Sequence, residues 1–152
     1  MSGKKKGKSK SEENEFALIK NVVDKQNIRI DDVKVFASID YPIFSFKYLQ
    51  DVSVKDCKSP DFFKEFLFRL KKLSELGWNE IAKSDRHSFG TEKIPYKQIK
   101  PKNLLPKFIT PEVDLTVFRA TGSNLPFVGF RESKIFHVIF IETQFGDIYD
   151  HG

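Results

Sequence analysis

The segment that decides the fold is LTVFRATGSNLPFVGFRESKIFHVIFIETQFGDIYDH, residues 115–151. Apolar runs of strand length occupy residues 115–120, 127–131 and 135–142, and short turn-forming segments separate them. Parallel neighbours would need crossovers of about a dozen residues or more, and the gaps are too short for that. The sequence therefore predicts an antiparallel meander, followed by a last short extended piece at 147–150.

The third run is apolar on both faces. Its alternating residues are Phe136, Val138 and Phe140 on one side and Ile135, His137, Ile139 and Ile141 on the other. Such a strand is typical of the centre of a sheet that is covered on both sides. In this setting His137 is predicted to be a buried structural residue rather than a catalytic one.

A long amphipathic helix is predicted upstream of the meander. Ser59-Pro60-Asp61 has the features of a helix start, with proline at the first helical position and an acid in the first turn. The apolar stripe of this helix consists of Phe63, Phe66, Leu67, Leu70 and Leu73. Gly77 is expected to end it, and residues 78–82 are expected to continue as a shorter helix at a changed angle.

Further elements are expected before this helix. Residues 15–25 have apolar side chains at helical spacing, whereas residues 33–39 and 43–49 alternate with a period of two around a turn signal. The two alternating runs predict a β-hairpin. The expected fold class is α+β, with an antiparallel sheet of about five or six strands packed by one long helix and one or two short ones.

Composition divides the chain into a tail and one domain. Residues 1–14 contain no apolar residue after Met1 and are expected to form a disordered basic tail. Residues 15–152 are expected to form a single α+β domain. Within it, residues 83–111 are expected to form a long, basic, proline-rich loop with room for one short strand.

The net charge of +5 does not describe the domain. Five lysines in residues 1–10 account for it, since the rest of the chain has equal numbers of basic and acidic residues. Residues 83–107 nevertheless carry seven Lys or Arg against two acids. A nucleic-acid interaction would therefore depend on this local patch.

Several classes of protein are not indicated. The single cysteine excludes an internal disulfide, no apolar run is long enough to span a membrane, and the basic N-terminus lacks the apolar segment of a signal peptide. A cytoplasmic protein is expected. Glycine-rich phosphate loops and zinc motifs are absent, and the acids Glu142, Asp147 and Asp150 are only a weak Mg²⁺ pattern, so no metal site is predicted.

Four residues of the meander match the needs of metal-free RNA cleavage. That reaction requires a base for the ribose 2′-hydroxyl, an acid for the leaving oxygen, and cations for the phosphate. His151 and Tyr149 could be the base and the acid. Arg119 and Arg131, at the ends of neighbouring strands, could bind the phosphate, or each could form a surface ion pair with an acid.

The basic loop supplies the expected RNA contacts. These are Arg86, His87, Lys93, Lys97, Lys100 and Lys102. Lysines follow a phosphate backbone, and the aromatic side chains between them can stack on bases. The alternative is an ordinary solvated surface.

The same residues carry a family resemblance. Arg119 before a turn, FVGFR at 127–131, FHVIFIE at 136–142 and IYDH at 148–151 resemble the C-terminal half of RelE/ParE-superfamily toxins. The resemblance implies a RelE-like fold, cleavage of messenger RNA, often on the ribosome, and a cognate antitoxin as partner. This chain differs from that pattern in its extra elements before the long helix, its basic insertion and the acids of its final strand.

The sequence thus predicts an RNA-directed, toxin-like endoribonuclease, a hydrolase that needs neither metal nor cofactor. The alternative is a non-enzymatic interaction or accessory protein of a mobile element that uses the same fold as a scaffold. A nuclease should bring Arg119, Arg131, Tyr149 and His151 into one concave, positively charged site. A scaffold would scatter them, or pair each arginine with an acid.

Overall fold

The computed structural model describes residue 10 and residues 29–55, 59–120 and 125–151. The chain divides into two compact units, residues 1–39 and 40–152. Apart from Lys10, the tail and the helix expected at 15–25 lie outside the described residues, as does the turn expected at 121–124.

The first unit contains helix α2 (Ile30–Ser38), so the strand predicted at 33–39 is wrong. Val33 and Phe36, three residues apart, are partly buried, whereas Val35 is 65% exposed. That is the spacing of a helix face rather than of a strand. Two acids in the first turn also favour a helix N-terminus, where they face the positive end of the dipole.

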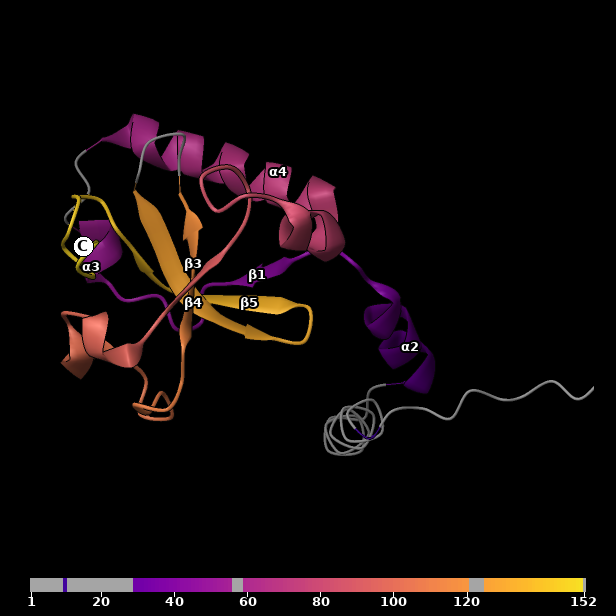
Figure 1. Ribbon diagram of the computed structural model, residues 1–152. Helices are drawn as coiled ribbons and strands as arrows, with labels where there is room; N and C mark the ends of the chain where they lie inside the picture. Colours follow the sequence, from indigo (N-terminus) through magenta and orange to yellow (C-terminus); the bar gives the residue numbers. More distant parts are fainter. Residues whose placement is uncertain (1–9, 11–28, 56–58, 121–124, 152) are drawn as a thin grey trace, which may run out of the picture. The chain divides into compact units, whose positions relative to one another are not determined.

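The second unit is built on a five-stranded sheet with the order β1-β5-β4-β3-β2 (Figure 1). Its strands are β1 (Ile43–Ser45), β2 (Glu92–Ile94), β3 (Leu115–Arg119), β4 (Pro126–Glu132) and β5 (Ile135–Ile141). The predicted meander is confirmed, because β3, β4 and β5 pair antiparallel in sequence order. The α+β class is confirmed as well, and β5 lies inside the sheet, between β1 and β4, with buried residues on both of its faces.

The sheet is mixed rather than purely antiparallel. Strand β1 pairs parallel with β5, placing Phe44 opposite Phe136. The hairpin predicted for residues 33–49 is therefore wrong, and β1 is also shorter than expected. Parallel pairing is possible because the chain between β1 and β5 is long enough to contain the crossover.

Helix α4 (Pro60–Lys83) bends where the sequence predicted a break; a single turn of helix, α3 (Val52–Lys55), precedes it. Gly77 has φ 81° and ψ 165°, a backbone conformation that glycine adopts readily and that a side chain would disfavour. The N–H of Trp78 donates to the carbonyl of Asp40 at 2.7 Å, and a Cβ on Gly77 would lie 2.9 Å from that oxygen. The residues after Gly77 thus form the predicted shorter helix.

Helix α4 covers one face of the sheet (Figure 1). Phe66, Leu70 and Leu73 are buried there against the sheet, as predicted from the helical stripe, and Phe63 is partly buried. Trp78, after the bend, is buried in the same cluster. Leu67 was assigned to the same stripe, but it is 68% exposed. It lies at the edge of the stripe, on the side of the helix that is open to solvent.

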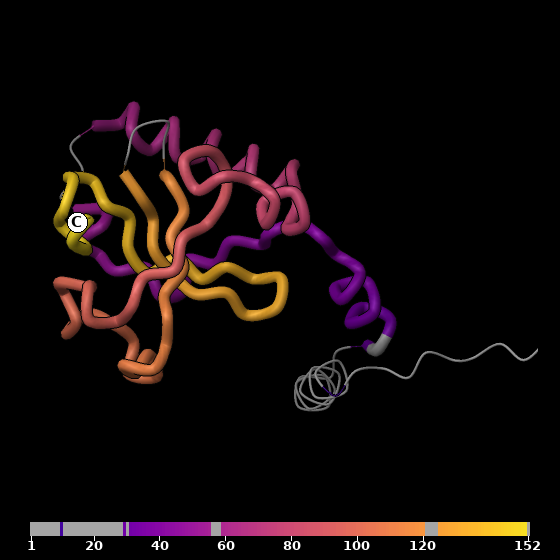
Figure 2. Tube along the Cα trace, viewed as in Figure 1, coloured from indigo at the N-terminus to yellow at the C-terminus, as the bar shows by residue number. Residues whose placement is uncertain are grey.

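Residues 83–111 cover the opposite face and are more ordered than a surface loop. Figure 2 traces this segment, which contains β2 and two short 3-10 helices, η1 (Tyr96–Gln98) and η2 (Lys102–Leu104). Ile94, Ile99, Leu105 and Ile109 from this segment are buried in a second core with Val117, Val128 and Ile139. The predicted short strand is present, and the residues around it contribute buried side chains to this second core.

Among the helices that the structure describes, none has the length and apolar character needed to cross a membrane.

Candidate functional site

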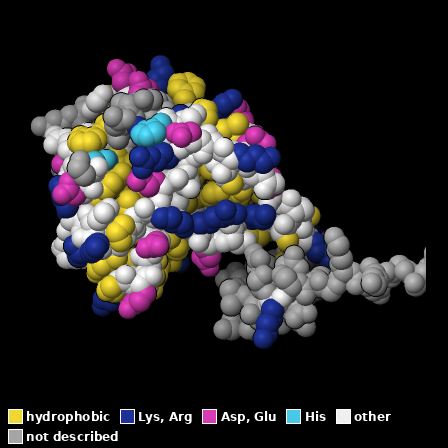
Figure 3. Space-filling view, viewed as in Figure 1, with side chains coloured by type: hydrophobic (Ala, Val, Ile, Leu, Met, Phe, Trp, Pro, Cys, Tyr) yellow, Lys and Arg dark blue, Asp and Glu magenta, His cyan; other side chains and the backbone are white. Residues whose placement is uncertain are grey.

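A cavity of about 350 Å³ lies where residues 84–98, β3 and the C-terminal segment meet. Five of the ten residues predicted to be catalytic or RNA-binding line it: Arg86, His87, Arg119, Tyr149 and His151. On the face seen in Figure 3, histidine side chains border both basic and acidic ones. Segments far apart in the sequence therefore converge on one concave surface.

His151 is held by a buried carboxylate. Its Nε2 lies 2.6 Å from Oε1 of Glu142, a side chain with no exposed surface. The backbone N–H groups of Gly146 and Ile148 also donate to Glu142, at 2.9 and 3.1 Å. Because both carboxylate oxygens accept, Nε2 of His151 carries the hydrogen, and in the neutral ring Nδ1 keeps a lone pair that can accept a proton.

Two aromatic rings fix the plane of this imidazole. Phe145 stacks on His151 with ring centroids 4.0 Å apart, and Tyr149 stacks at 4.1 Å. Two rings this close and nearly parallel must occupy opposite faces of the imidazole. The ring is thus oriented by packing on both faces and by a hydrogen bond at its edge, the support that an acid–base group requires.

Tyr149 remains a proton donor over the physiological range. The residue is 6% exposed and its backbone bridges to Ile99. Burial, followed by the charges of Glu92 and Glu142, raises the pKa of Tyr149 to about 12. The hydroxyl therefore keeps its proton at neutral pH and can donate it.

Arg119 is positioned by the loop that follows α4. Its Nε donates to the carbonyl of Arg86 at 3.2 Å, and its Nη2 lies 2.5 Å from Nδ1 of His87. A guanidinium group can only donate, so Nδ1 of His87 accepts and the hydrogen of the neutral ring is on Nε2. The 3.3 Å approach of the Arg86 Nε to that same Nε2 is then a contact between two donors.

The loop itself closes around Gly90. The backbone N–H of Gly90 and of Ser88 both donate to the carbonyl of Asp85, and that of Phe89 donates to the Ser84 hydroxyl. A Cβ on Gly90 would overlap the carbonyl oxygen of Ser84. Only glycine permits this close approach, and the resulting turn brings Arg86 and His87 to the cavity.

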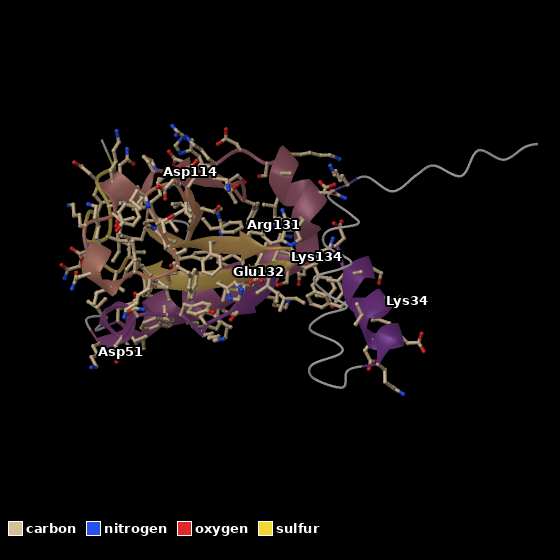
Figure 4. All side chains as sticks on the ribbon, turned by 90° about the horizontal axis from the view of Figure 1, so that it is seen from below. Lys34, Asp51, Asp114, Arg131, Glu132 and Lys134 are labelled. Atoms are coloured by element: carbon tan, nitrogen blue, oxygen red, sulfur yellow. The ribbon has the colours of Figure 1, made fainter. Side chains whose placement is uncertain are left out.

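Arg131 does not line this cavity. Alternation places Arg119 on the same face as Val117, whereas Arg131 pairs with Phe136 on the face covered by α4. Its guanidinium carbon lies 3.8 Å from the centroid of the Trp78 ring, and Nε donates to Ser133 at 2.7 Å. Figure 4 shows Arg131, Glu132 and Lys134 together at the turn from β4 to β5.

The four predicted RNA-binding lysines lie outside the cavity lining. Lys93 donates to the Thr116 hydroxyl at 3.0 Å, and Lys100 donates to the carbonyl of Gly146. Lys97 and Lys102 are exposed on η1 and η2. Of the six residues assigned to RNA contact, Arg86 and His87 thus line the cavity, and the four lysines do not.

The cavity lining has balanced formal charge rather than the positive charge expected of a nuclease. Arg86 and Arg119 are matched by Glu92 and Asp150, and Arg86 forms an ion pair with Glu92 at 3.0 Å. Burial and then the nearby charge of Arg119 lower the pKa of Arg69 on α4. Two guanidinium groups therefore repel one another at the edge of the site, and an anion there would relieve that repulsion.

Sequence reasoning missed two residues of this site. Glu142 was considered only as a weak Mg²⁺ ligand, although an acid that ends a central apolar strand signals a buried, partnered carboxylate. Phe145 has no sequence signal, because an exposed phenylalanine in a turn is not unusual. His137 is buried as predicted, with Nε2 3.0 Å from Glu132, but its Nδ1 has no hydrogen-bond partner.

Within the described ranges, no group of three or more His, Cys, Asp or Glu side chains could hold a metal ion. Comparisons of this chain with known protein families, with curated proteins and with solved structures each find no match.

Proposed function

We propose that this chain is a metal-independent endoribonuclease whose active site is the cavity lined by Arg119, Tyr149 and His151. The observation that carries the proposal is the Glu142–His151 pair beside a buried tyrosine and an arginine in the same cavity. These groups provide the base, acid and cation that cleavage of a ribose phosphodiester needs.

The proposed reaction uses the ribose 2′-hydroxyl as the nucleophile. Nδ1 of His151 takes its proton, the 2′-oxygen attacks phosphorus, and the bond from phosphorus to the 5′-oxygen breaks. Tyr149 gives its proton to the leaving 5′-oxygen; with a pKa of about 12 it is a stronger acid than the alcohol that leaves. The products are a 2′,3′-cyclic phosphate and a 5′-hydroxyl end.

The remaining groups bind and orient in this scheme. Arg119 supplies planar donors to the non-bridging phosphate oxygens, and His87 holds that guanidinium in place. Glu142 is a positioning residue, since it touches His151 rather than the substrate and sets which imidazole nitrogen is free to act as base.

Toxin behaviour is part of the proposal and depends on the resemblance alone. It implies growth arrest on expression, cleavage of messenger RNA on or off the ribosome, and relief by a cognate antitoxin. Two observations favour the alternative of a non-enzymatic scaffold: the Arg86–Glu92 ion pair and the packing of Arg131 on Trp78.

The test is incubation of the purified chain with RNA in EDTA, with the new ends identified. Cleavage leaving cyclic phosphate ends is expected, and an all-DNA strand should stay intact because it lacks the 2′-hydroxyl. His151→Ala should lower the rate by about 10²–10⁴-fold, the usual size of an acid–base contribution. Intact RNA under all conditions, with ribosomes present or absent, would contradict the proposal.

Two arginines provide a matched control. Arg119→Ala should slow cleavage, whereas Arg131→Ala should leave the rate unchanged in protein that is still folded, because Arg131 lies on the other face of the sheet. Circular dichroism and thermal denaturation would report folding for both variants. Equal losses of rate would show that the cavity is not the reacting site.

A further inference from the structure

We infer that this cavity accepts an unpaired nucleotide whose base stacks on Phe145, so that the substrate is single-stranded RNA or a loop and not a duplex. The inference rests on the proposed function and adds the substrate class of the same site.

Phe145 is the outermost member of a column of rings. Tyr149, His151 and Phe145 stack in that order, with centroid distances of 4.1 and 4.0 Å. Phe145 is 62% exposed, although one of its faces is covered by His151. The exposed area is therefore largely the outer face and edge, where a further planar group would continue the column.

A nucleobase is the planar group that RNA offers. Bases of single-stranded RNA stack on aromatic side chains, and every base has a face that can do so. In a duplex both faces of each internal base are already stacked, so a paired base cannot reach Phe145 without leaving the helix. The stack would also hold the adjoining ribose phosphate beside His151, where the proposed base acts.

The size and lining of the cavity agree with a single nucleotide. A volume of about 350 Å³ is near the lower end of small-molecule sites, which range over about 300–1,000 Å³. Gln98 and Asp150 also line it. The amide of Gln98 and the carboxylate of Asp150 can pair with donors and acceptors on the edge of a base. Asp150, which would repel a phosphate, could thus accept a hydrogen bond from the base.

The experiment measures binding separately from cleavage. A labelled RNA strand with every 2′-hydroxyl methylated cannot undergo the proposed reaction, and its affinity is measured by fluorescence anisotropy, alone and annealed to its complement. The single strand should bind about tenfold or more tightly than the duplex. Phe145→Ala should weaken single-strand binding about 5- to 150-fold, which corresponds to about 1–3 kcal/mol for one stacked base.

Two variants separate stacking from general damage. Phe145→Trp keeps a stacking face and should retain affinity. Phe68→Ala removes a ring that is also 62% exposed, but from α4 and away from the cavity, so affinity should be unchanged. Thermal denaturation of each variant identifies any loss of folded protein.

The outcomes distinguish the two proposals. Equal affinity for single strand and duplex, or a Phe145→Ala effect below about twofold, overturns the inference even if unmodified RNA is cleaved. Stack-dependent binding without cleavage of unmodified RNA supports the inference and contradicts the nuclease. No binding to either form overturns the inference, and cleavage of unmodified RNA then decides the nuclease separately.

Discussion

Replacing Glu142 by glutamine should loosen the segment that carries the candidate base and acid. Glu142 accepts three hydrogen bonds: Oε1 from Gly146 and His151, and Oε2 from Ile148. A glutamine side chain has one accepting oxygen, so in either orientation its amide group faces at least one of these donors. One buried N–H then loses its acceptor, which should lower the free energy of unfolding by about 1–3 kcal/mol.

A double-mutant cycle isolates the Glu142–His151 interaction. His151→Phe removes the ring nitrogens but keeps a flat ring between Phe145 and Tyr149, so it changes the hydrogen bond more than the stacking. The coupling energy between Glu142→Gln and His151→Phe should be about 1.5–3 kcal/mol, the range for hydrogen bonds to charged groups.

Urea unfolding of the four proteins, followed by the fluorescence of Trp78, gives these energies. The comparison holds only if the free energy of unfolding falls with urea concentration at the same slope in each variant as in the wild type. A coupling below about 0.5 kcal/mol would mean that the two mutations are additive. The buried pair would then not hold His151, and the argument for an oriented base would fail.

The remaining predictions concern the core, the tyrosine and the loop. Leu70→Ala should lower the free energy of unfolding by about 2–5 kcal/mol through lost burial and a cavity, whereas Leu67→Ala, 68% exposed on the same helix, should change it by about 0.5 kcal/mol or less. The fold raises the pKa of Tyr149 from about 10 in the unfolded chain to about 12. The stabilisation that the neutral hydroxyl contributes is therefore complete below a pH of about 10 and is lost as the pH rises through about 12. Tyr149→Phe should remove this alkaline loss when the free energy of unfolding is measured against pH. Gly90→Ala should disrupt the loop that carries Arg86, lowering RNA affinity and the melting temperature together.

Sequence patterns correctly predicted the elements whose structure depends mainly on interactions between residues close together in the chain. The meander and α4 were found because their periodicity, turn spacing and helix signals all agree. The hairpin prediction failed at residues 33–39, where a period of two and a helical spacing are both present and the acids of the first turn favour the helix. The pairing of β1 with β5 joins distant segments, and no feature of β1 alone specifies that partner.

The site was predicted in composition but not in geometry. His151, Tyr149 and Arg119 converge because the final segment bridges to Ile99 through Tyr149 and lines the same cavity as the end of β3. The separation of Arg119 from Arg131 depends on the register of β3 and β4, in which Arg119 faces Pro126, five residues before Arg131. A turn of unknown geometry between two strands fits several registers, so the sequence could not decide which face each arginine occupies.

The groups of the candidate site are supported by the core itself. Ile148 and Tyr149 are buried among the residues of the second core, and the carbonyl of Ile148 accepts from the N–H of Lys100 at 2.8 Å. The segment that covers the sheet therefore also fixes the position of Tyr149, and the residue directly after β5, Glu142, supplies the carboxylate that holds His151. Burying a carboxylate contributes little net stability even when it is well partnered, and an apolar residue would fill the same space. The Glu142–His151 pair is thus better explained by the orientation it gives the imidazole than by the stability of the fold, and this favours a reacting site over a scaffold.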